Sequence, residues 1–161
     1  MTQFSSSVHS TADVSAPRQA VWDTLTDPTL LPKLTPMLER IEADGDTWRW
    51  SMVCISALGV SIAPSFTEQM SFDPPTRIVY THRAPAGARE RAGAEGVYQL
   101  SEIDGGTHLE IDLTLTIDLP LPRAAGPAVR GVMHSMMTRT GDRFAANLLT
   151  HLGARALTPA R

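Results

Sequence analysis

The most informative part of the sequence is residues 108–150. It begins with HLEIDLTLTID (108–118) and, after a proline-rich turn, continues with GPAVRGVMHSMMTRTGDRFAANLLT (126–150). Every odd position from Leu109 to Ile117 is apolar and every even position is polar, which predicts a strand with one buried face. From Val129 to Leu148 apolar residues recur at helical spacing, which predicts a long, one-sided C-terminal helix.

Working outward, the sequence predicts a strand, two short helices and further strands before this segment. Loose alternation indicates a first strand over about Ser7–Ser15. Ala16-Pro17 opens a helix, because proline suits the first helical turn, and Asp27-Pro28 ends it. A second short helix is expected around Leu30–Leu34. The spacing then changes from helical to two, and further strands are expected over 47–54, 65–73, 77–83 and 96–103.

Clean alternation means that only one face of the predicted antiparallel sheet is covered, and the long helix is the element available to cover it. The predicted fold class is therefore α+β, with a sheet of about seven strands. The chain has 161 residues and a mass of 17.4 kDa. This size predicts a single domain over 1–161, with a core over about 6–153 and short flexible termini.

Charge and composition exclude several functions. With 14 Lys and Arg against 17 Asp and Glu, the net charge is −3, and nucleic acid is not an expected partner. The longest charge-free stretch, 50–67, is interrupted by Ser, Gly and Pro, so no membrane insertion is expected. There is no secretory signal pattern and one cysteine, Cys54, so we expect a cytoplasmic protein. No metal or nucleotide motif is present, and no cofactor is expected. Monomer and homodimer both stay open.

Three segments resemble the helix-grip superfamily of START-like, Bet v 1-like and polyketide cyclase-like proteins (SRPBCC). These are Ala12–Pro28, the stretch from Phe72-Asp73-Pro74-Pro75 to Tyr80, and the stretch from Gly96-Val97-Tyr98 through Gly105-Gly106-Thr107 to Asn147-Leu148-Leu149. Together they span nearly the whole chain in the right order. The resemblance implies a curved antiparallel sheet wrapped around the long C-terminal helix, with an internal apolar cavity between them.

If the chain has that fold, the inward-facing side chains of the sheet and the helix should line the cavity. Methionine is prominent among them, and its unbranched, polarisable side chain adapts to irregular apolar ligands. Ordinary core packing is the alternative explanation for the same residues. The positions expected in the cavity wall are Trp48, Trp50, Met52, Phe66, Met70, Tyr80, Leu113, Leu115, Val129, Met133, Met136, Met137, Thr140 and Phe144.

Three polar side chains share strand parity with these apolar positions: Glu68, His82 and Tyr98. A carboxyl placed among apolar groups has a raised pKa, so Glu68 is the candidate general acid or base. His82 would relay a proton and Tyr98 would donate a hydrogen bond to a ligand carbonyl. The alternative is that Glu68 turns to solvent and that the other two are satisfied by backbone groups near a sheet end.

Two functions follow from the resemblance. The first is binding of a hydrophobic small molecule, such as a polyketide, lipid or aromatic natural product, for sequestration, transport or self-protection. The alternative is a polyketide aromatase/cyclase that promotes aldol cyclisation and dehydration with the three polar residues. The catalytic motif of family cyclases has no residue-by-residue match in this sequence, and one fold hosts many functions.

Overall fold

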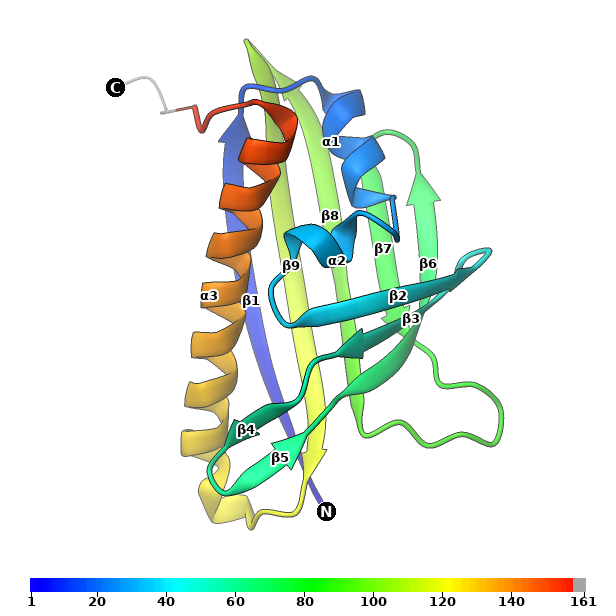
Figure 1. Cartoon of the computed structure of the whole chain (residues 1–161), viewed down its shortest axis with the longest axis vertical. Coiled ribbons are helices and arrows are strands. Elements are labelled where there is room, and N and C mark those ends of the chain that lie inside the picture. Colours follow the sequence, from blue (N-terminus) through cyan, green and yellow to red (C-terminus); the bar gives the residue numbers. More distant parts are fainter. Residues whose placement is uncertain (158–161) are drawn as a thin grey trace.

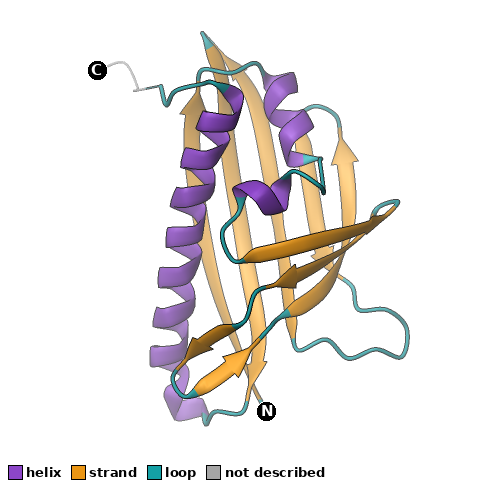
Figure 2. Ribbon diagram, viewed as in Figure 1, coloured by secondary structure: helices purple, strands orange, loops and turns teal. Residues whose placement is uncertain are grey.

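A long helix lies across one face of a strongly curved antiparallel sheet in the computed structural model, which describes residues 1–157 (Figures 1 and 2). The helices are α1 (Arg18–Leu25), α2 (Leu31–Leu34) and α3 (Gly126–Leu152), with a 3-10 turn at Arg123–Ala125. The strands are β1 (Thr2–Val14), β2 (Leu38–Asp44), β3 (Thr47–Met52), β4 (Ile55–Ala57), β5 (Val60–Ile62), β6 (Ser65–Asp73), β7 (Arg77–His82), β8 (Ala92–Ile103) and β9 (Gly106–Leu119).

Seven strands form the main sheet in the order β1-β9-β8-β7-β6-β3-β2, and β4 and β5 form a separate hairpin. All strand pairs are antiparallel. The first and last strands of the chain lie side by side in the sheet, since β1 pairs with β9 from Thr2–Leu119 to Val14–Thr107. The predicted α+β class, the long helix and the number of strands are confirmed.

Three strand boundaries differ from the sequence prediction, and one strand was not predicted. β1 starts at Thr2 rather than near Ser7, because its polar first half pairs with the end of β9. β8 starts at Ala92 within the stretch expected to be a loop, because Ala92 pairs with Ile117. β3 ends at Met52, so Cys54 lies outside it and is exposed. β2 was not predicted, and its side chains are mostly exposed, which removes the alternating pattern.

α3 is attached to the sheet at both ends. Near its start, Val129 packs with Phe4 of β1 and Leu119 of β9. Near its end, Leu148 belongs to the main core, and beyond the helix the Arg155 carbonyl accepts a hydrogen bond from the Ser15 backbone N–H at 2.9 Å. The helix is therefore fixed at its two ends. Within residues 1–157, no helix is long and apolar enough to cross a membrane.

The β8–β9 hairpin is tied to the segment that leads into α1. Thr107 is fully buried, and its hydroxyl donates a hydrogen bond of 2.7 Å to the Ala16 carbonyl. The neighbouring Gly106 lies against β1 so closely that an added Cβ would stand 1.9 Å from the Val14 carbonyl oxygen, so only glycine fits there. This contact positions the start of α1 over the end of the sheet.

We expect Thr107→Val to lower the free energy of unfolding by about 1–3 kcal/mol, because it removes the donor to a buried carbonyl while keeping the shape of the side chain. Chemical denaturation followed by circular dichroism measures the change. Thr81→Val, at an exposed strand position of β7, is the matched control and should change stability by less than about 0.5 kcal/mol. Equal effects of the two substitutions would contradict the role given to the Thr107 hydroxyl.

Candidate functional site

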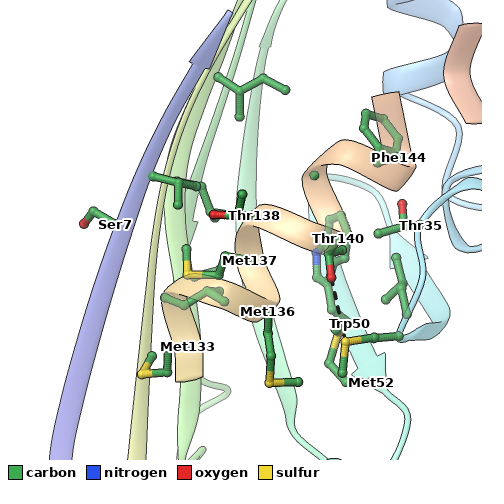
Figure 3. Close-up of a pocket in the computed structure, with 18 of the residues that line it drawn as sticks. Ser7, Thr35, Trp50, Met52, Met133, Met136, Met137, Thr138, Thr140 and Phe144 are labelled. Carbon is green, nitrogen blue, oxygen red and sulfur yellow. Dashed lines mark hydrogen bonds between the residues drawn. The ribbon is translucent and has the colours of Figure 1, made fainter. Parts of the chain in front are cut away.

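A pocket of about 750 Å³ lies between α3 and the concave face of the sheet. Its wall is built from both layers and is mostly apolar. Figure 3 shows Met133, Met136 and Met137 of α3 in this wall, together with Trp50 and Met52 of β3. Thr140 of α3 also lies there, and its hydroxyl contacts the Met37 sulfur at 3.7 Å. A pocket of this size and lining suits an apolar small molecule.

The fourteen residues expected from the sequence to line a cavity all lie in the wall of this pocket: Trp48, Trp50, Met52, Phe66, Met70, Tyr80, Leu113, Leu115, Val129, Met133, Met136, Met137, Thr140 and Phe144. They come from β3, β6, β7, β9 and α3. Strand parity and helical spacing therefore predicted correctly that these residues lie together. Whether they bind a ligand stays a prediction.

Part of the wall was missed by the sequence reasoning. The β4–β5 hairpin contributes Ile55, Val60 and Ile62, and its tight turn is at Leu58-Gly59, where both residues have positive φ. Alternation on either side of that turn is the signal that could have identified it. The short helices and the loop after them contribute a second missed group, namely Leu25, Leu31, Thr35, Met37 and Leu38. Both helices were predicted, but so few residues do not show which side chains face a pocket.

Glu68 is the polar residue of greatest interest in the wall. It lies in β6 opposite Trp48 of β3, and it is only 2% exposed. Burial raises the pKa of its carboxyl to about 8, and the nearby indole N–H of Trp50 acts weakly in the opposite direction. The contact falls short of a hydrogen bond: among the described residues, neither Oε2 of Glu68 nor Nε1 of Trp50 has a partner.

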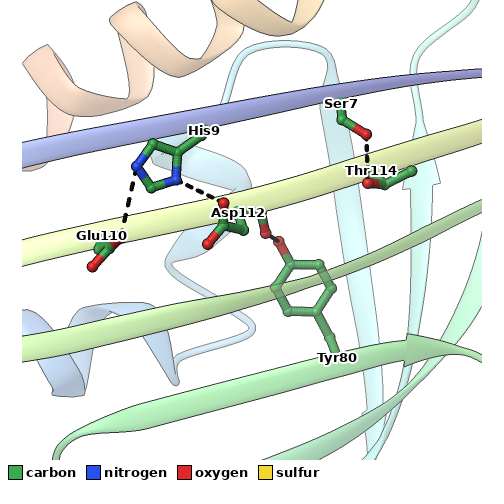
Figure 4. Close-up of polar contacts among 6 residues, drawn as sticks. All are labelled: Ser7, His9, Tyr80, Glu110, Asp112 and Thr114. Carbon is green, nitrogen blue, oxygen red and sulfur yellow. Dashed lines mark hydrogen bonds and ion pairs between the residues drawn. The ribbon is translucent and has the colours of Figure 1, made fainter.

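Two tyrosines lie beside Glu68 in the same wall. The rings of Tyr80 and Tyr98 have centroids 5.2 Å apart, at 59° to each other. Burial, followed by the Glu68 charge, raises the pKa of Tyr98 to about 12. The pKa of Tyr80 is raised well above its usual value, first by burial and then by the neighbouring Tyr98 and Glu68. Tyr80 crosses Gly96 and donates a 3.2 Å hydrogen bond to the Asp112 carbonyl (Figure 4). Both phenols therefore stay neutral and keep the proton with which a hydroxyl donates a hydrogen bond.

The side chain of His82 lies in a different environment from those of Glu68 and the two tyrosines. It pairs with Glu68 in the register of β6 and β7, but its Nε2 is 3.0 Å from Oε1 of Glu90. The Glu90 carboxylate also accepts hydrogen bonds from the backbone N–H and the hydroxyl of Thr67, both 2.8 Å long. The structure therefore brings Glu68 and Tyr98 together in the pocket wall, whereas the imidazole of His82 is engaged with Glu90. Its predicted proton relay stays a prediction.

His9, Glu110 and Asp112 form a second polar group, on β1 and β9 (Figure 4). Glu110 and Asp112 alternate with the pocket-facing Ile111 and Leu113, so they project from the opposite face of β9. Nδ1 of His9 is 2.6 Å from the Asp112 carboxylate, and Nε2 is 3.6 Å from that of Glu110. The hydrogen bond to Asp112 raises the pKa of His9. This exposed ion-pair network lies outside the group of polar residues around Glu68.

A curved antiparallel sheet around a long helix, with an apolar pocket between them, is the helix-grip architecture. The chain belongs to the family described as polyketide cyclase/dehydrase and lipid transport, whose model matches residues 5–149. Among curated proteins, none matches the chain in sequence.

Solved structures share the fold at low sequence identity. A protein from Thermus thermophilus has a TM-score of 0.68 and 17% identity, with 91% of this chain and 96% of that chain covered. The Zhui aromatase/cyclase from Streptomyces sp. R1128 has a TM-score of 0.64 and 17% identity, with 92% and 94% covered. A START superfamily protein from Mycobacterium smegmatis has a TM-score of 0.64 and 17% identity, with 91% and 97% covered. These similarities support the fold.

The raised pKa of Glu68 predicts a pH-dependent stability. Between about pH 4.5 and 8 the folded protein holds the Glu68 proton, whereas the unfolded chain releases it. The free energy of unfolding attributable to this group therefore falls as the pH rises through this range, by up to about 1.4 kcal/mol per pH unit. Glu68→Gln lacks this effect, so its stability relative to the wild type should increase from pH 4.5 to 8.

Urea denaturation of both proteins at several pH values measures this difference. Glu39→Gln, at an exposed position of β2, is the control and should show no comparable trend. A stability difference between Glu68→Gln and the wild type that stays constant across the range would show that Glu68 is not protonated in the folded protein.

Proposed function

We propose that this protein binds a hydrophobic small molecule, such as a polyketide, lipid or aromatic natural product, in the pocket between α3 and the sheet. The observation that carries the proposal is the pocket itself, about 750 Å³ in volume and lined by methionine, tryptophan and aliphatic side chains. Large apolar pockets with few polar groups are typical of ligand sites. Membership of a family described by polyketide chemistry and lipid transport supports the same substrate class.

The form of the wall supports binding and carriage rather than simple packing. Met133 and Met136 lie in the pocket wall and are only half-buried, so neighbouring side chains do not enclose them fully. Flexible thioether side chains adjust to ligands of different outline. A carrier that sequesters or transports such a compound, or protects against it, requires an adaptable wall of this kind. It does not need catalytic residues.

A second candidate function, polyketide aromatase/cyclase, is favoured by one observation. Glu68 is a buried carboxyl in the pocket wall with a pKa of about 8, which suits proton transfer near neutral pH. In its ionised form it would remove the proton between two ketone groups, and the resulting enolate would attack a second carbonyl of the chain. Tyr98 would donate a hydrogen bond to the oxygen that gains charge, and loss of water would follow.

Introducing a charge into the pocket should abolish ligand binding. We expect Met136→Asp to weaken binding of palmitate and naringenin at least about tenfold, because the ligand would have to desolvate a carboxylate. Native mass spectrometry of protein mixed with each compound measures the bound fraction. Ser135→Asp adds the same charge on the exposed side of α3, outside the pocket wall, and should leave binding unchanged. Equal binding by both variants would place the ligand elsewhere.

The cyclase function predicts a protein-dependent mass loss of one water from a linear poly-β-ketone mimic. Glu68→Gln should slow this reaction at least about 100-fold, in keeping with the contribution of a general acid or base, while binding of the mimic persists. Liquid chromatography with mass spectrometry follows the product. Turnover that is unchanged in Glu68→Gln would exclude Glu68 as the acid–base group, and an intact mimic would favour the carrier function.

A further inference from the structure

Two hydrogen-bonding atoms in the pocket wall lack partners. Oε2 of Glu68 and Nε1 of Trp50 are both buried, and neither has a hydrogen-bond partner within residues 1–157. The two residues lie on neighbouring strands: Trp48 pairs with Glu68 and Trp50 pairs with Phe66, so Trp50 and Glu68 are diagonal neighbours on one face. Figure 3 shows Trp50 in the pocket that Thr140 and Phe144 of α3 also line.

An unpaired buried polar group costs about 1–3 kcal/mol, and such groups in folded proteins call for a specific explanation. Phenylalanine in place of Trp50 would leave no N–H unpaired, and an apolar side chain in place of Glu68 would pack among Phe66, Met70 and Tyr98. The pair therefore works against stability in the empty protein. A ligand atom that satisfies both groups would recover this cost.

The chemistry of the two groups restricts that ligand atom. The indole N–H is only a donor, so the ligand must accept a hydrogen bond. A ketone oxygen can also accept a hydrogen bond from neutral Glu68, but it has no proton to donate once the carboxyl ionises. A hydroxyl accepts from Trp50 and donates to Glu68 in both protonation states of the carboxyl.

We propose that Trp50 and Glu68 together recognise one neutral hydroxyl group on an otherwise apolar ligand. This inference rests on the proposed ligand-binding function of the pocket and specifies the polar group that the ligand carries there. The hydroxyl oxygen accepts a hydrogen bond from the N–H at Nε1 of Trp50, and the hydroxyl O–H donates a hydrogen bond to Oε2 of Glu68. Alcohols and phenols of suitable size share this chemistry, whereas a purely hydrocarbon ligand leaves both atoms unpaired.

The other titratable groups near Glu68 do not change this assignment. Tyr80 of β7 and Tyr98 of β8 have raised pKa values, so both phenols stay neutral when Glu68 ionises. His82 of β7 is engaged with Glu90, and β3 presents Trp48 and Trp50 on this face. From α3, His134 and Asp142 reach the pocket wall but are exposed. Glu68 is therefore the group whose ionisation changes hydrogen bonding at the proposed point.

Three fluorescent probes with one ring system test the proposal: 1-pyrenemethanol, 1-acetylpyrene and 1-methylpyrene. At about pH 6.5 the wild-type protein should bind the alcohol about tenfold more tightly than the methyl compound, the difference expected from one to two recovered hydrogen bonds. At about pH 9.5, with Glu68 ionised, the alcohol should keep its advantage, whereas that of the ketone should fall, because it retains only the hydrogen bond from Trp50. Fluorescence titration measures each Kd.

Substitutions then assign the effect to the two residues. Glu68→Leu and Trp50→Phe should each lower the Kd ratio of methyl compound to alcohol from about ten toward one, because each removes one of the two hydrogen bonds, whereas Glu68→Gln, which keeps a donor and an acceptor, should preserve it. The ratio corrects for any general change of the pocket, and Glu68→Leu provides the test if Trp50→Phe fails to fold. Equal wild-type affinity for all three probes overturns the hydroxyl assignment but leaves the pocket function intact. Failure of all three to bind overturns both.

Discussion

The structure depends on one constraint: α3 must cover the concave face of the sheet, and hydrophobic clusters anchor it near its two ends. A helix of 27 residues is about 40 Å long, and the sheet curves away beneath it. The buried residues of α3 reflect this. Val129 belongs to a small cluster with Phe4 and Leu119, and Leu148 belongs to the large cluster around α1. The core is thus divided, and the pocket lies along the helix between the two contacts.

This division explains the composition of the helix. Between the two attachment points Met137 is buried, whereas Met133, Met136 and Phe144 are only partly buried, so tight packing determines the shape of few side chains there. Methionine suits such positions because its flexible, unbranched side chain can make favourable contacts in an irregular site. The β4–β5 hairpin and α2 then contribute further residues to the pocket wall, in addition to those of the main sheet. A short element is sufficient for this, because only one of its faces contacts the pocket.

Periodicity made much of the fold predictable. The odd positions of β9 and the stripe of α3 face one environment along their whole lengths, so burial imposes a regular pattern on the sequence. The same parity placed Glu68 among apolar neighbours. Parity fails where a strand begins or ends. The start of β8 contains Ala92, Gly93 and Ala94, which have weak strand preference and are held by pairing with β9.

His82 shows the limit of such reasoning for the candidate site. It shares parity with Ile78 and Tyr80, yet its side chain is engaged with Glu90, because β7 ends there and the following loop returns a carboxylate to the same place. Parity predicts the face on which a side chain starts, but not the partner that a loop supplies. The sequence also could not predict that Trp50 Nε1 and Glu68 Oε2 lack hydrogen-bond partners, because this depends on which polar groups the neighbouring strands place beside them.

The same energetic feature underlies both candidate functions. Without a ligand, Glu68 favours its protonated form up to about pH 8, because burial penalises its charge more than Trp50 compensates. A ligand that donates a hydrogen bond to Oε2 stabilises the ionised form and lowers the pKa of Glu68, whereas an apolar ligand excludes water and raises it. The ligand therefore determines whether the carboxyl only holds its cargo or can take up a proton. Carriage and cyclisation would then differ in the chemistry of the bound molecule rather than in the architecture of the protein.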